Sequence, residues 1–337
     1  MNATQDQDRL PFVIVSHTLP ESWLSRLDGR CRLLIGPETT ASSGLAPELA
    51  QRLPEADGLF ALLTVPVGPS LLEKAPRLRV VSNMAVGVDN VDLAACTERG
   101  IPVGHTPGVL TEGTADLTMA LLLAAARRLP EASQDARLGR WTTWEPAGWL
   151  GADLTGATLG IVGMGKIGTA VAQRAAAFGL RLVYNSRSPK PDVERQLGAR
   201  PMPLDDLLRQ SDFVSLHVPL TAETRYLIDQ DALRLMKPSA ILINVARGPV
   251  VDSAALYQAL HEGQISAAGL DVTDPEPLPP GDPLYSLPNC LIVPHIGSAT
   301  VNTRRRMAEL ACDNLLAGLA GKKLPHCANP AVYAGSQ

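Results

Sequence analysis

The sequence predicts an α/β protein made of two doubly wound parallel-sheet domains, and three observations support this fold class. The chain has 337 residues, which corresponds to about two domains of ordinary size. Short apolar runs alternate with helical patterns along nearly the whole chain, as in parallel sheets that helices cover on both faces. A glycine-rich turn at 160–168 lies between an apolar strand and an alanine-rich helix, as in a dinucleotide-binding unit.

The first series of elements predicts one compact domain that ends near residue 105. Helical stretches such as Glu21–Leu27 and Pro47–Leu53 separate its apolar runs. The expected strands are Pro11–His17, Cys31–Ile35, Gly58–Thr64, Leu78–Asn83 and Ile101–Gly104. A long apolar-rich helix, roughly Thr114–Leu129, follows this domain.

The segment Pro130–Leu150 is expected to be a loop, and it holds three of the four tryptophans of the chain. These are Trp141, Trp144 and Trp149. Two interpretations are open. The loop packs on its own domain, or it is an arm that packs on a partner subunit, where tryptophan is favoured.

A second α/β series begins at Thr158 and ends with a helix at about Asn302–Leu319. The proline-rich stretch Asp274–Pro283 is expected to be a surface loop, because proline cannot donate a hydrogen bond to a sheet. The expected strands are Thr158–Val162, Leu180–Tyr184, Phe213–His217, Ala240–Val245, Ala267–Val272 and Cys290–Val293.

Composition argues against several classes of function. The chain has 30 Lys and Arg residues against 34 Asp and Glu residues, with no basic run and few aromatic residues, so it lacks the signature of a nucleic-acid-binding protein. Its longest apolar run, Met119–Ala126, is too short to span a membrane, and Met1–Leu10 has no signal-peptide layout. The five cysteines are scattered without a CxxC pair, so we expect a cytoplasmic protein with reduced thiols and no metal site.

The strongest motif is the glycine-rich turn, which predicts a dinucleotide-binding site. Gly163 allows the tight turn, Gly165 lets the backbone approach a pyrophosphate, and Gly168 lets helix and strand pack closely. Lys166 and Ile167 lie within this turn and are expected to contact the cofactor, and the helix that follows, Thr169–Phe178, offers N-terminal N–H groups and a positive dipole end to the phosphate. The alternative is a turn whose glycines are only structural.

The residues after the second strand of this unit favour NADP over NAD. An NAD site usually has Asp or Glu about 20 residues beyond the glycines, but Asn185 stands there. A carboxylate would repel a 2′-phosphate, whereas a guanidinium binds it through paired hydrogen bonds. We therefore expect the 2′-phosphate among Asn185, Ser186, Arg187 and Ser188, with NAD as a weaker substitute. The alternative is that Arg187 is only a solvated loop residue.

Three further segments place charged residues after apolar strands, where open α/β sheets bind their ligands. They are Ile243–Gly248 with Arg247, Gly269–Pro277 with Asp271 and Glu276, and Val293–Ser298 with His295. Each alone has a simpler explanation: a solvated arginine, a carboxylate in a turn, or a structural histidine. Together they supply a cation, carboxylates and an imidazole.

These motifs, in this order over about residues 10–330, resemble the D-isomer-specific 2-hydroxyacid dehydrogenase family. The family-level segments are Gly160–Gly168, Asn244–Gly248, Leu270–Val272, Pro275–Pro277 and Pro294–Ser298. Within the family the chain is most similar to the glyoxylate/hydroxypyruvate reductases, through the segments Ala85–Asp89, Thr106–Thr111, Arg127–Ala132, Trp141–Trp144, Leu270–Thr273 and His295–Thr300.

The resemblance implies a Rossmann cofactor domain, residues 106–289, inserted into a flavodoxin-like substrate domain, residues 1–105 and 290–337, with the active site in the cleft. It also implies a homodimer built on the cofactor domains. The segment around Trp144 would then contact the substrate site of the neighbouring subunit.

The resemblance also implies roles for single residues. NADPH would reduce a small 2-oxo acid, glyoxylate or hydroxypyruvate, to glycolate or D-glycerate by hydride transfer. Arg247 and the N–H groups of Val86 and Gly87 would bind the substrate, and His295, supported by Glu276, would donate the proton. Asp271 would help to place the nicotinamide. Further cofactor contacts would come from Thr114, His217, Pro219, Val245, Ala246, Gly297 and Ser298.

Other functions remain open at this stage. A broad-range 2-oxo acid reductase, or a phosphite or formate dehydrogenase, would carry the same Arg and His. A phosphoglycerate dehydrogenase with an added regulatory domain is disfavoured, because only about 40 residues follow His295. A dinucleotide-sensing protein like the corepressors of the family would keep the catalytic residues, but this chain lacks basic tails and low-complexity segments. An assay with several 2-oxo acids separates these alternatives.

Overall fold

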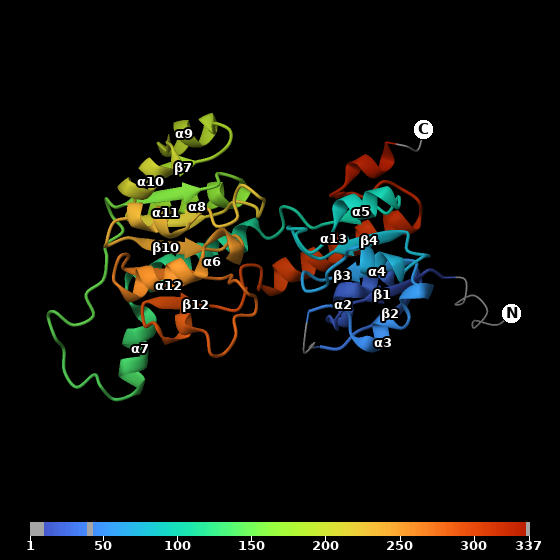
Figure 1. The fold of residues 1–337 in the computed structure, drawn as a ribbon, viewed down its shortest axis with the longest axis horizontal. Coiled ribbons are helices and arrows are strands. Elements are labelled where there is room, and N and C mark those ends of the chain that lie inside the picture. Colours follow the sequence, from blue (N-terminus) through green and yellow to red (C-terminus); the bar gives the residue numbers. More distant parts are fainter. Residues whose placement is uncertain (1–9, 39–42, 335–337) are drawn as a thin grey trace. The chain divides into compact units, whose positions relative to one another are not determined.

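The structure is a computed structural model that describes residues 10–38 and 43–334 (Figure 1). It divides the chain into two compact units. Unit 1 contains Met1–Leu110 and Thr300–Gln337, and unit 2 contains Thr111–Ala299. The N-terminal stretch used in the signal-peptide argument lies outside the described residues, apart from Leu10. The expected fold class, two α/β units with parallel sheets, is confirmed.

Unit 1 is built on a five-stranded parallel sheet in the order β2-β1-β3-β4-β5, which is the flavodoxin-like order. Its strands are β1 (Phe12–Val15), β2 (Arg32–Ile35), β3 (Gly58–Ala61), β4 (Val80–Asn83) and β5 (Val103–Gly104). Its helices are α2 (Glu21–Leu24), η1 (Ser25–Leu27), α3 (Pro47–Ala50), η2 (Leu53–Glu55), α4 (Pro69–Glu73), α5 (Leu93–Glu98), α13 (Val301–Leu319) and η5 (Pro330–Tyr333).

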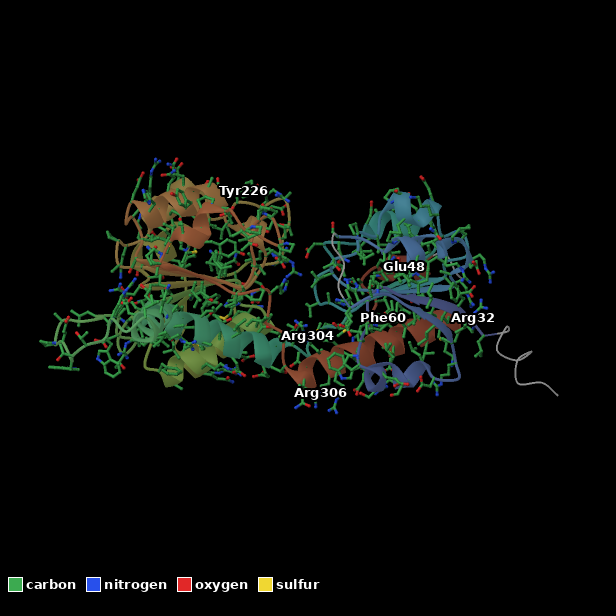
Figure 2. The ribbon with its side chains drawn as sticks, turned by 90° about the horizontal axis from the view of Figure 1, so that it is seen from below. Arg32, Glu48, Phe60, Tyr226, Arg304 and Arg306 are labelled. Carbon is green, nitrogen blue, oxygen red and sulfur yellow. The ribbon has the colours of Figure 1, made fainter. Side chains whose placement is uncertain are left out.

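Alternation of side chains along the strands gives unit 1 an apolar core on each face of its sheet. Ile14 packs into the cluster that α3, α4 and α5 cover, whereas Val13 and Val15 pack into the cluster under α2 and α13. Figure 2 shows Phe60 of β3 beside α13, and both belong to the second cluster. The C-terminal helix therefore completes the first domain of the chain.

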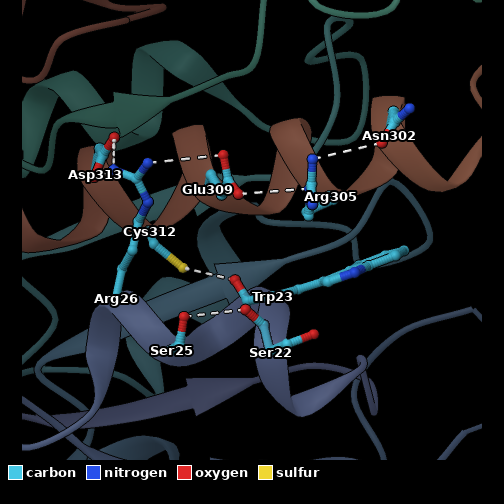
Figure 3. Close-up of polar contacts among 9 residues, drawn as sticks. All are labelled: Ser22, Trp23, Ser25, Arg26, Asn302, Arg305, Glu309, Cys312 and Asp313. Carbon is cyan, nitrogen blue, oxygen red and sulfur yellow. Dashed lines mark hydrogen bonds and ion pairs between the residues drawn. The ribbon is translucent and has the colours of Figure 1, made fainter.

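Polar contacts also hold α13 to the sheet and to α2. The buried hydroxyl of Ser82 donates to the Ala311 carbonyl at 2.7 Å. Figure 3 shows Arg26 beside Asp313 and Glu309 on α13, with nitrogen–oxygen distances of 2.8 and 3.7 Å. These ion pairs are partly exposed and each contributes little free energy, so the apolar core provides most of the binding of α13.

Unit 2 is built on a seven-stranded parallel sheet in the order β12-β11-β10-β9-β6-β7-β8. Its strands are β6 (Thr158–Val162), β7 (Arg181–Asn185), β8 (Arg200–Pro201), β9 (Phe213–Leu216), β10 (Ile241–Asn244), β11 (Ala267–Leu270) and β12 (Cys290–Ile292). Its helices are α6 (Thr111–Ala126), α7 (Leu129–Arg137), α8 (Lys166–Ala177), α9 (Pro191–Leu197), α10 (Leu204–Gln210), α11 (Gln230–Leu235), η3 (Gly248–Val250), α12 (Ser253–His261) and η4 (Pro283–Ser286).

This strand order reverses between β6 and β9, which pair directly. It is the Rossmann order with one strand added at the β12 edge, and the reversal is where such sheets bind ligands. Ile161 packs under α6 and α8 on one face of the sheet, and Val162 packs under α10, α11 and α12 on the other. The two faces are therefore covered, as the continuous apolar strands predicted.

Both expected domain boundaries and one expected loop differ from the structure. The first boundary, expected at 105/106, falls at 110/111. The expected second domain boundary at 289/290 is wrong, because β12 pairs with β11 through Ala268 and Cys290 and the division falls at 299/300. His295 therefore belongs to unit 2. The expected loop at 130–150 begins as a helix, α7, with no buried residues. Figure 1 shows α7 and the segment after it extending away from the sheet.

Two of the three tryptophans of this segment do not pack on their own unit. Trp141 and Trp144 are 74% and 79% exposed. Trp149 is 41% exposed and lies under the guanidinium of Arg128, 4.9 Å from the ring centre. The interpretation that the loop packs on its own domain is therefore wrong for Trp141 and Trp144.

No helix in the described ranges has both the length and the apolar character needed to cross a bilayer. Over the same ranges, His, Cys, Asp and Glu side chains form no group of three that could hold a metal ion. All five cysteines lie in described segments and are free thiols, three of them buried.

Candidate active site

The glycine-rich turn between β6 and α8 has the geometry of a phosphate-binding loop. Gly163 has φ +100°, and a Cβ there would lie 2.7 Å from the His217 carbonyl carbon. A Cβ at Gly168 would lie 2.2 Å from the Gly163 oxygen, whereas a Cβ at Gly165 would meet nothing within 4 Å. Gly163 and Gly168 are therefore required by packing, and Gly165 borders open space.

The open space at Gly165 lies at the N-terminus of α8. Gly165 is the N-cap and provides no side-chain hydrogen bond to the helix, and Lys166 and Ile167 form its first turn. The turn lies at the carboxyl end of β6. This strand pairs with β9, and the strand order of the sheet reverses between the two. Unused N–H groups, a positive dipole end and room beside a glycine fit the pyrophosphate of a dinucleotide.

The loop after β7 carries the residues that we expect around a 2′-phosphate. Asn185 lies at the end of β7, where its side-chain amide donates to the Met202 carbonyl at 3.0 Å and its own carbonyl accepts from Gly163. Ser186 is half-buried, and Arg187 and Ser188 are exposed. The Asn185 amide is thus used inside the protein, and Ser186–Ser188 are the residues of this set that face outward.

A buried phenol holds the far end of the same loop. The Tyr184 hydroxyl donates to the Glu194 carboxylate at 2.6 Å and accepts from the Lys190 N–H at 2.8 Å. Burial, and then the hydrogen bond to Glu194, raise the pKa of Tyr184, so the phenol keeps its proton. The shape of the loop is therefore determined before any ligand binds.

The positive charge of Arg187 also acts on a carboxylate in the segment after β9. The pKa of Glu223 is lowered by a hydrogen bond with Thr221 and, to a smaller extent, by the positive charge of Arg187. Glu223 lies in the segment after β9, beyond His217 and Pro219. The loop after β7 and the segment after β9 therefore border the same side of the sheet.

The turn after β10 presents Arg247. Asn244 is buried, and its side chain accepts from the Ala246 N–H at 3.0 Å and donates to the Arg247 carbonyl at 2.9 Å. Nη1 of Arg247 donates to the Ala246 carbonyl at 2.8 Å. Val245 and Ala246 are themselves buried. No role was expected for Asn244, although a polar residue at the end of an apolar strand is typical of a turn that the side chain braces.

The Arg247 turn lies directly against the segment after β11. A Cβ at Gly248 would lie 1.8 Å from the Thr273 carbonyl oxygen, so only glycine fits there. Strands β10 and β11 pair through Asn244 and Leu270, which brings the two carboxyl-terminal turns together. Arg247 and the acidic segment Asp271–Glu276 are thus neighbours at one edge of the sheet.

Asp271 holds the turn that carries His295. It is 2% exposed, and its two carboxylate oxygens accept from the N–H groups of Ile296 at 2.6 Å and Gly297 at 2.9 Å. The His295 N–H donates to the Asp271 carbonyl, and His295 has φ +51°, a left-handed conformation that costs free energy for a non-glycine residue. Burial raises the pKa of Asp271, and the hydrogen bonds oppose that effect.

His295 and Glu276 form a direct pair. Nδ1 of His295 lies 2.5 Å from Oε1 of Glu276, and the two side chains are 28% and 32% exposed. Because the carboxylate takes Nδ1, the other ring nitrogen is left to exchange a proton with a ligand. This is the arrangement of a general acid–base whose orientation a carboxylate sets.

The remaining predicted cofactor residues lie in two places, beside the turn that Asp271 holds and, for His217, beside the glycine turn at Gly163. The Thr114 hydroxyl donates to the Gly297 carbonyl at 3.2 Å, and Ser298 follows that glycine. Nε2 of His217 lies 2.8 Å from the Ser215 hydroxyl, and burial lowers the pKa of His217 to about 3. Pro219 is exposed beyond it, and its carbonyl accepts from the Thr224 hydroxyl.

Three predicted substrate residues lie elsewhere in the chain. Val86 and Gly87 belong to unit 1, in the segment after β4, and both are half-buried. Trp144 lies on the segment after α7 and is 79% exposed. The sheet edge of unit 2 therefore carries Arg247, Glu276, His295, Asp271 and the glycine turn, whereas Trp144 is exposed on the segment after α7.

Comparison with known proteins gives consistent matches. Residues 119–297 match the family described as "D-isomer specific 2-hydroxyacid dehydrogenase, NAD binding domain". A glyoxylate reductase of Korarchaeum cryptofilum is 48% identical over 96% of this chain and 97% of its own length. A solved protein of Thermus thermophilus is 50% identical, with a TM-score of 0.88 over 94% of this chain and 99% of that one.

A third match was solved with ligands. It is the NADPH-dependent glyoxylate/hydroxypyruvate reductase of Sinorhizobium meliloti, in complex with NADP and malonate. It is 35% identical, with a TM-score of 0.82 over 95% of this chain and 98% of that one.

Proposed function

Because the chain belongs to the D-isomer-specific 2-hydroxyacid dehydrogenase family, we propose that it reduces small 2-oxo acids, glyoxylate and hydroxypyruvate first among them, with NADPH. The observation that carries this proposal is the pair of His295 and Glu276, at 2.5 Å, on the sheet edge that also holds the open glycine turn and Arg247. The names of the related reductases support the choice of substrates.

The residues of the chain supply binding and proton chemistry. When bound, a reduced nicotinamide dinucleotide supplies the hydride. Arg247 binds the substrate carboxylate or polarises its oxo group, and the N–H groups of Val86 and Gly87 in unit 1 bind the carboxylate. Protonated His295 gives its proton to the oxygen on which negative charge develops, and Glu276 holds the imidazole in place. In the oxidative direction the same imidazole accepts the proton.

The proposed preference for NADPH rests on the loop after β7. This loop offers Ser186, Arg187 and Ser188 and has no carboxylate before Asp192. A guanidinium and two hydroxyls match the three oxygens of a 2′-phosphate. Tyr184 holds the loop in shape through its hydrogen bonds with Glu194 and Lys190, at 2.6 and 2.8 Å, so less conformational entropy is lost when the cofactor binds.

We further propose a homodimer in which the segment after α7 packs on the partner. Trp141 and Trp144 are 74% and 79% exposed, and Leu138 is 56% exposed on the same segment. Large apolar side chains gathered on an extended arm are typical of a protein interface. Trp144 would then contact the substrate site of the partner subunit.

A steady-state assay tests the activity. Oxidation of the reduced cofactor is followed with glyoxylate, hydroxypyruvate and pyruvate, each with NADPH and with NADH. We expect turnover of the first two that is faster with NADPH. Equal turnover of all three would favour a broad-range 2-oxo acid reductase. If all three are inert while NADPH binds, the substrate assignment is wrong, and formate and phosphite become the next substrates to test.

A further inference from the structure

In the segment after β4, the carbonyl groups are hydrogen-bonded within unit 1, whereas two successive N–H groups have no acceptor in the described part of the chain. The carbonyls of Ala85, Val86 and Gly87 all accept hydrogen bonds from unit 1. The donors are the Thr106 N–H at 2.8 Å, Nδ1 of His105 at 3.0 Å and Nδ2 of Asn83 at 3.1 Å, respectively. Within the described part of the chain, no acceptor is paired with the N–H of Val86 or Gly87.

This arrangement leaves adjacent N–H groups available to an anion. Backbone N–H groups in succession form an anion-binding concavity. Because the carbonyls are each held by a separate donor, the direction of the N–H groups does not depend on the ligand. The segment is therefore preorganised for the carboxylate that the proposed function requires.

His105 acts on the central peptide group of this segment. A carbonyl oxygen can only accept, so Nδ1 of His105 carries the proton in its contact with Val86. The Val86 carbonyl and the Gly87 N–H belong to one planar peptide group. A hydrogen bond to that oxygen fixes the plane of the peptide and polarises its N–H.

The position of His105 is itself fixed from behind. It follows β5, its N–H donates to the His326 carbonyl at 3.1 Å, and its carbonyl accepts from Nδ2 of Asn314 at 2.9 Å. Asn314 is fully buried on α13 and also accepts from the His326 N–H. The imidazole is therefore directed at Val86 by the C-terminal part of unit 1.

We propose that His105 is a positioning residue for the substrate carboxylate, acting through the peptide group of Val86 and Gly87. The inference rests on the proposed function, because the N–H groups matter only if a carboxylate binds there. His105 touches neither substrate nor cofactor in this proposal. Its removal should weaken carboxylate binding and leave cofactor binding and the chemical step nearly unchanged.

The test uses the full-length protein and three variants of His105. His105→Ala removes the donor. His105→Asn places an amide nitrogen near the position of Nδ1, and His105→Gln places it beyond that position. The measurements are KM and kcat for glyoxylate, the dissociation constant of oxamate with NADPH bound, the dissociation constant of NADPH, and thermal stability. His326→Ala is the matched control, because the hydrogen bonds of His326 in the described structure are made by its backbone.

We expect His105→Ala to raise KM for glyoxylate and the oxamate dissociation constant about 3- to 10-fold, the effect of one neutral hydrogen bond. The kcat and the NADPH dissociation constant should stay within about two-fold, and His105→Asn should restore carboxylate binding where His105→Gln does not. If His105 were purely structural, His105→Ala would lower thermal stability and the fraction of active protein. The Asn and Gln variants would then bind the carboxylate equally.

Two outcomes overturn the inference in different ways. If the wild type reduces glyoxylate and binds oxamate but His105→Ala keeps both constants, His105 has no positioning role and the proposed function stands. If the wild type neither reduces glyoxylate nor binds oxamate, the proposed function is wrong, and the proposed role of His105 is then wrong as well. If His105→Ala does not fold, equal oxamate binding by the Asn and Gln variants is the contradicting result.

Discussion

At the scale of single residues, His295 is the group on which the proposed chemistry depends most. Its left-handed backbone is held by the Asp271 carbonyl and by the N–H groups that donate to the Asp271 carboxylate, and Glu276 takes Nδ1. A role for Asp271 in placing a nicotinamide stays a prediction. Its two carboxylate oxygens already hold the turn that carries His295.

We expect His295→Asn to lower kcat for glyoxylate by about 10²- to 10⁴-fold, the usual contribution of a general acid. The dissociation constant of NADPH should change less than two-fold, because the glycine turn is intact. Steady-state kinetics and fluorescence titration of NADPH measure the two effects. Wild-type turnover in this variant would remove His295 from the mechanism.

Arg187→Ala should weaken NADPH binding by at least ten-fold and leave NADH binding within about two-fold, because only NADPH carries the 2′-phosphate. Glu223→Gln is the matched control. It removes the carboxylate whose pKa the charge of Arg187 helps to lower, so it should strengthen NADPH binding at low salt. Equal losses for both cofactors in Arg187→Ala would contradict a 2′-phosphate role.

His217 predicts a dependence of stability on pH. Burial lowers its pKa to about 3 in the folded protein, against about 6.5 when unfolded. Between pH 6.5 and pH 3, His217 is protonated in the unfolded chain but neutral in the folded protein. The free energy of unfolding is therefore highest above pH 6.5 and decreases as the pH falls below it. Because of His217, the free energy of unfolding should be about 2 kcal/mol lower at pH 5 than at pH 8.

The measurement is urea unfolding of the wild type and of His217→Gln at both pH values. Gln stays neutral, and its amide can reach Ser215. The pH-dependent loss should be about 2 kcal/mol smaller in the variant. The pKa of His17 is also lowered by burial, so the wild type keeps a further share of the slope that the variant does not remove. Identical slopes would show that His217 does not resist protonation.

At the scale of elements, the glycine-rich turn contains glycines that are required for two different reasons, packing and ligand binding. A Cβ at Gly168 would lie 2.2 Å from the Gly163 oxygen, but a Cβ at Gly165 would meet no protein atom within 4 Å. Gly168→Ala should lower the melting temperature by several degrees, because backbone must shift. Gly165→Ala should keep the wild-type melting temperature and lose at least ten-fold in NADPH affinity.

Melting curves without cofactor and titrations with NADPH give the two readouts for each variant. A folded Gly165→Ala variant that binds NADPH as tightly as the wild type would show that the open space is not a pyrophosphate site. Loss of stability in that variant would instead show that Gly165 is required by packing.

Element positions followed from the sequence more closely than element boundaries did. The expected strands at Thr158–Val162 and Phe213–His217 appear as β6 and as β9, which ends at Leu216, because buried parallel strands are continuous apolar runs. The helix α7 was missed because it is short, begins with Leu129 and Pro130, and buries no residue, so no run of core residues marks it in the sequence.

At the scale of the whole molecule, the exposed tryptophans predict a dimer. Light scattering should give twice the chain mass of 35.7 kDa at micromolar concentration. Replacing Trp141 and Trp144 by Ser should weaken association and lower turnover, since Trp144 is proposed to contact the partner's substrate site. Tyr285→Ser, another exposed aromatic outside the arm, is the control. A monomer in the wild type would refute the proposed role of the arm.

The sequence alone predicted the fold class and the glycine turn, because each depends on local pattern. It also placed Arg247, Glu276 and His295 after apolar strands, whereas their roles were implied by the family resemblance. An apolar strand followed by a polar turn can be read residue by residue. Asn185 can also be recognised in this way, because the sequence shows that it stands where an NAD site usually has Asp or Glu. The structure then paired His295 with Glu276 directly, at 2.5 Å.

Tertiary structure decided what depends on contacts between distant segments. That β12 joins the sheet of unit 2 rather than unit 1 follows from its pairing with β11, and that α13 completes unit 1 follows from the apolar face it buries. The same is true of Tyr184 with Glu194 and of His105 with Val86, where a side chain meets a partner 10 and 19 residues away. The spacing of residues along the chain does not specify such contacts, because they form only when packing brings the two segments together.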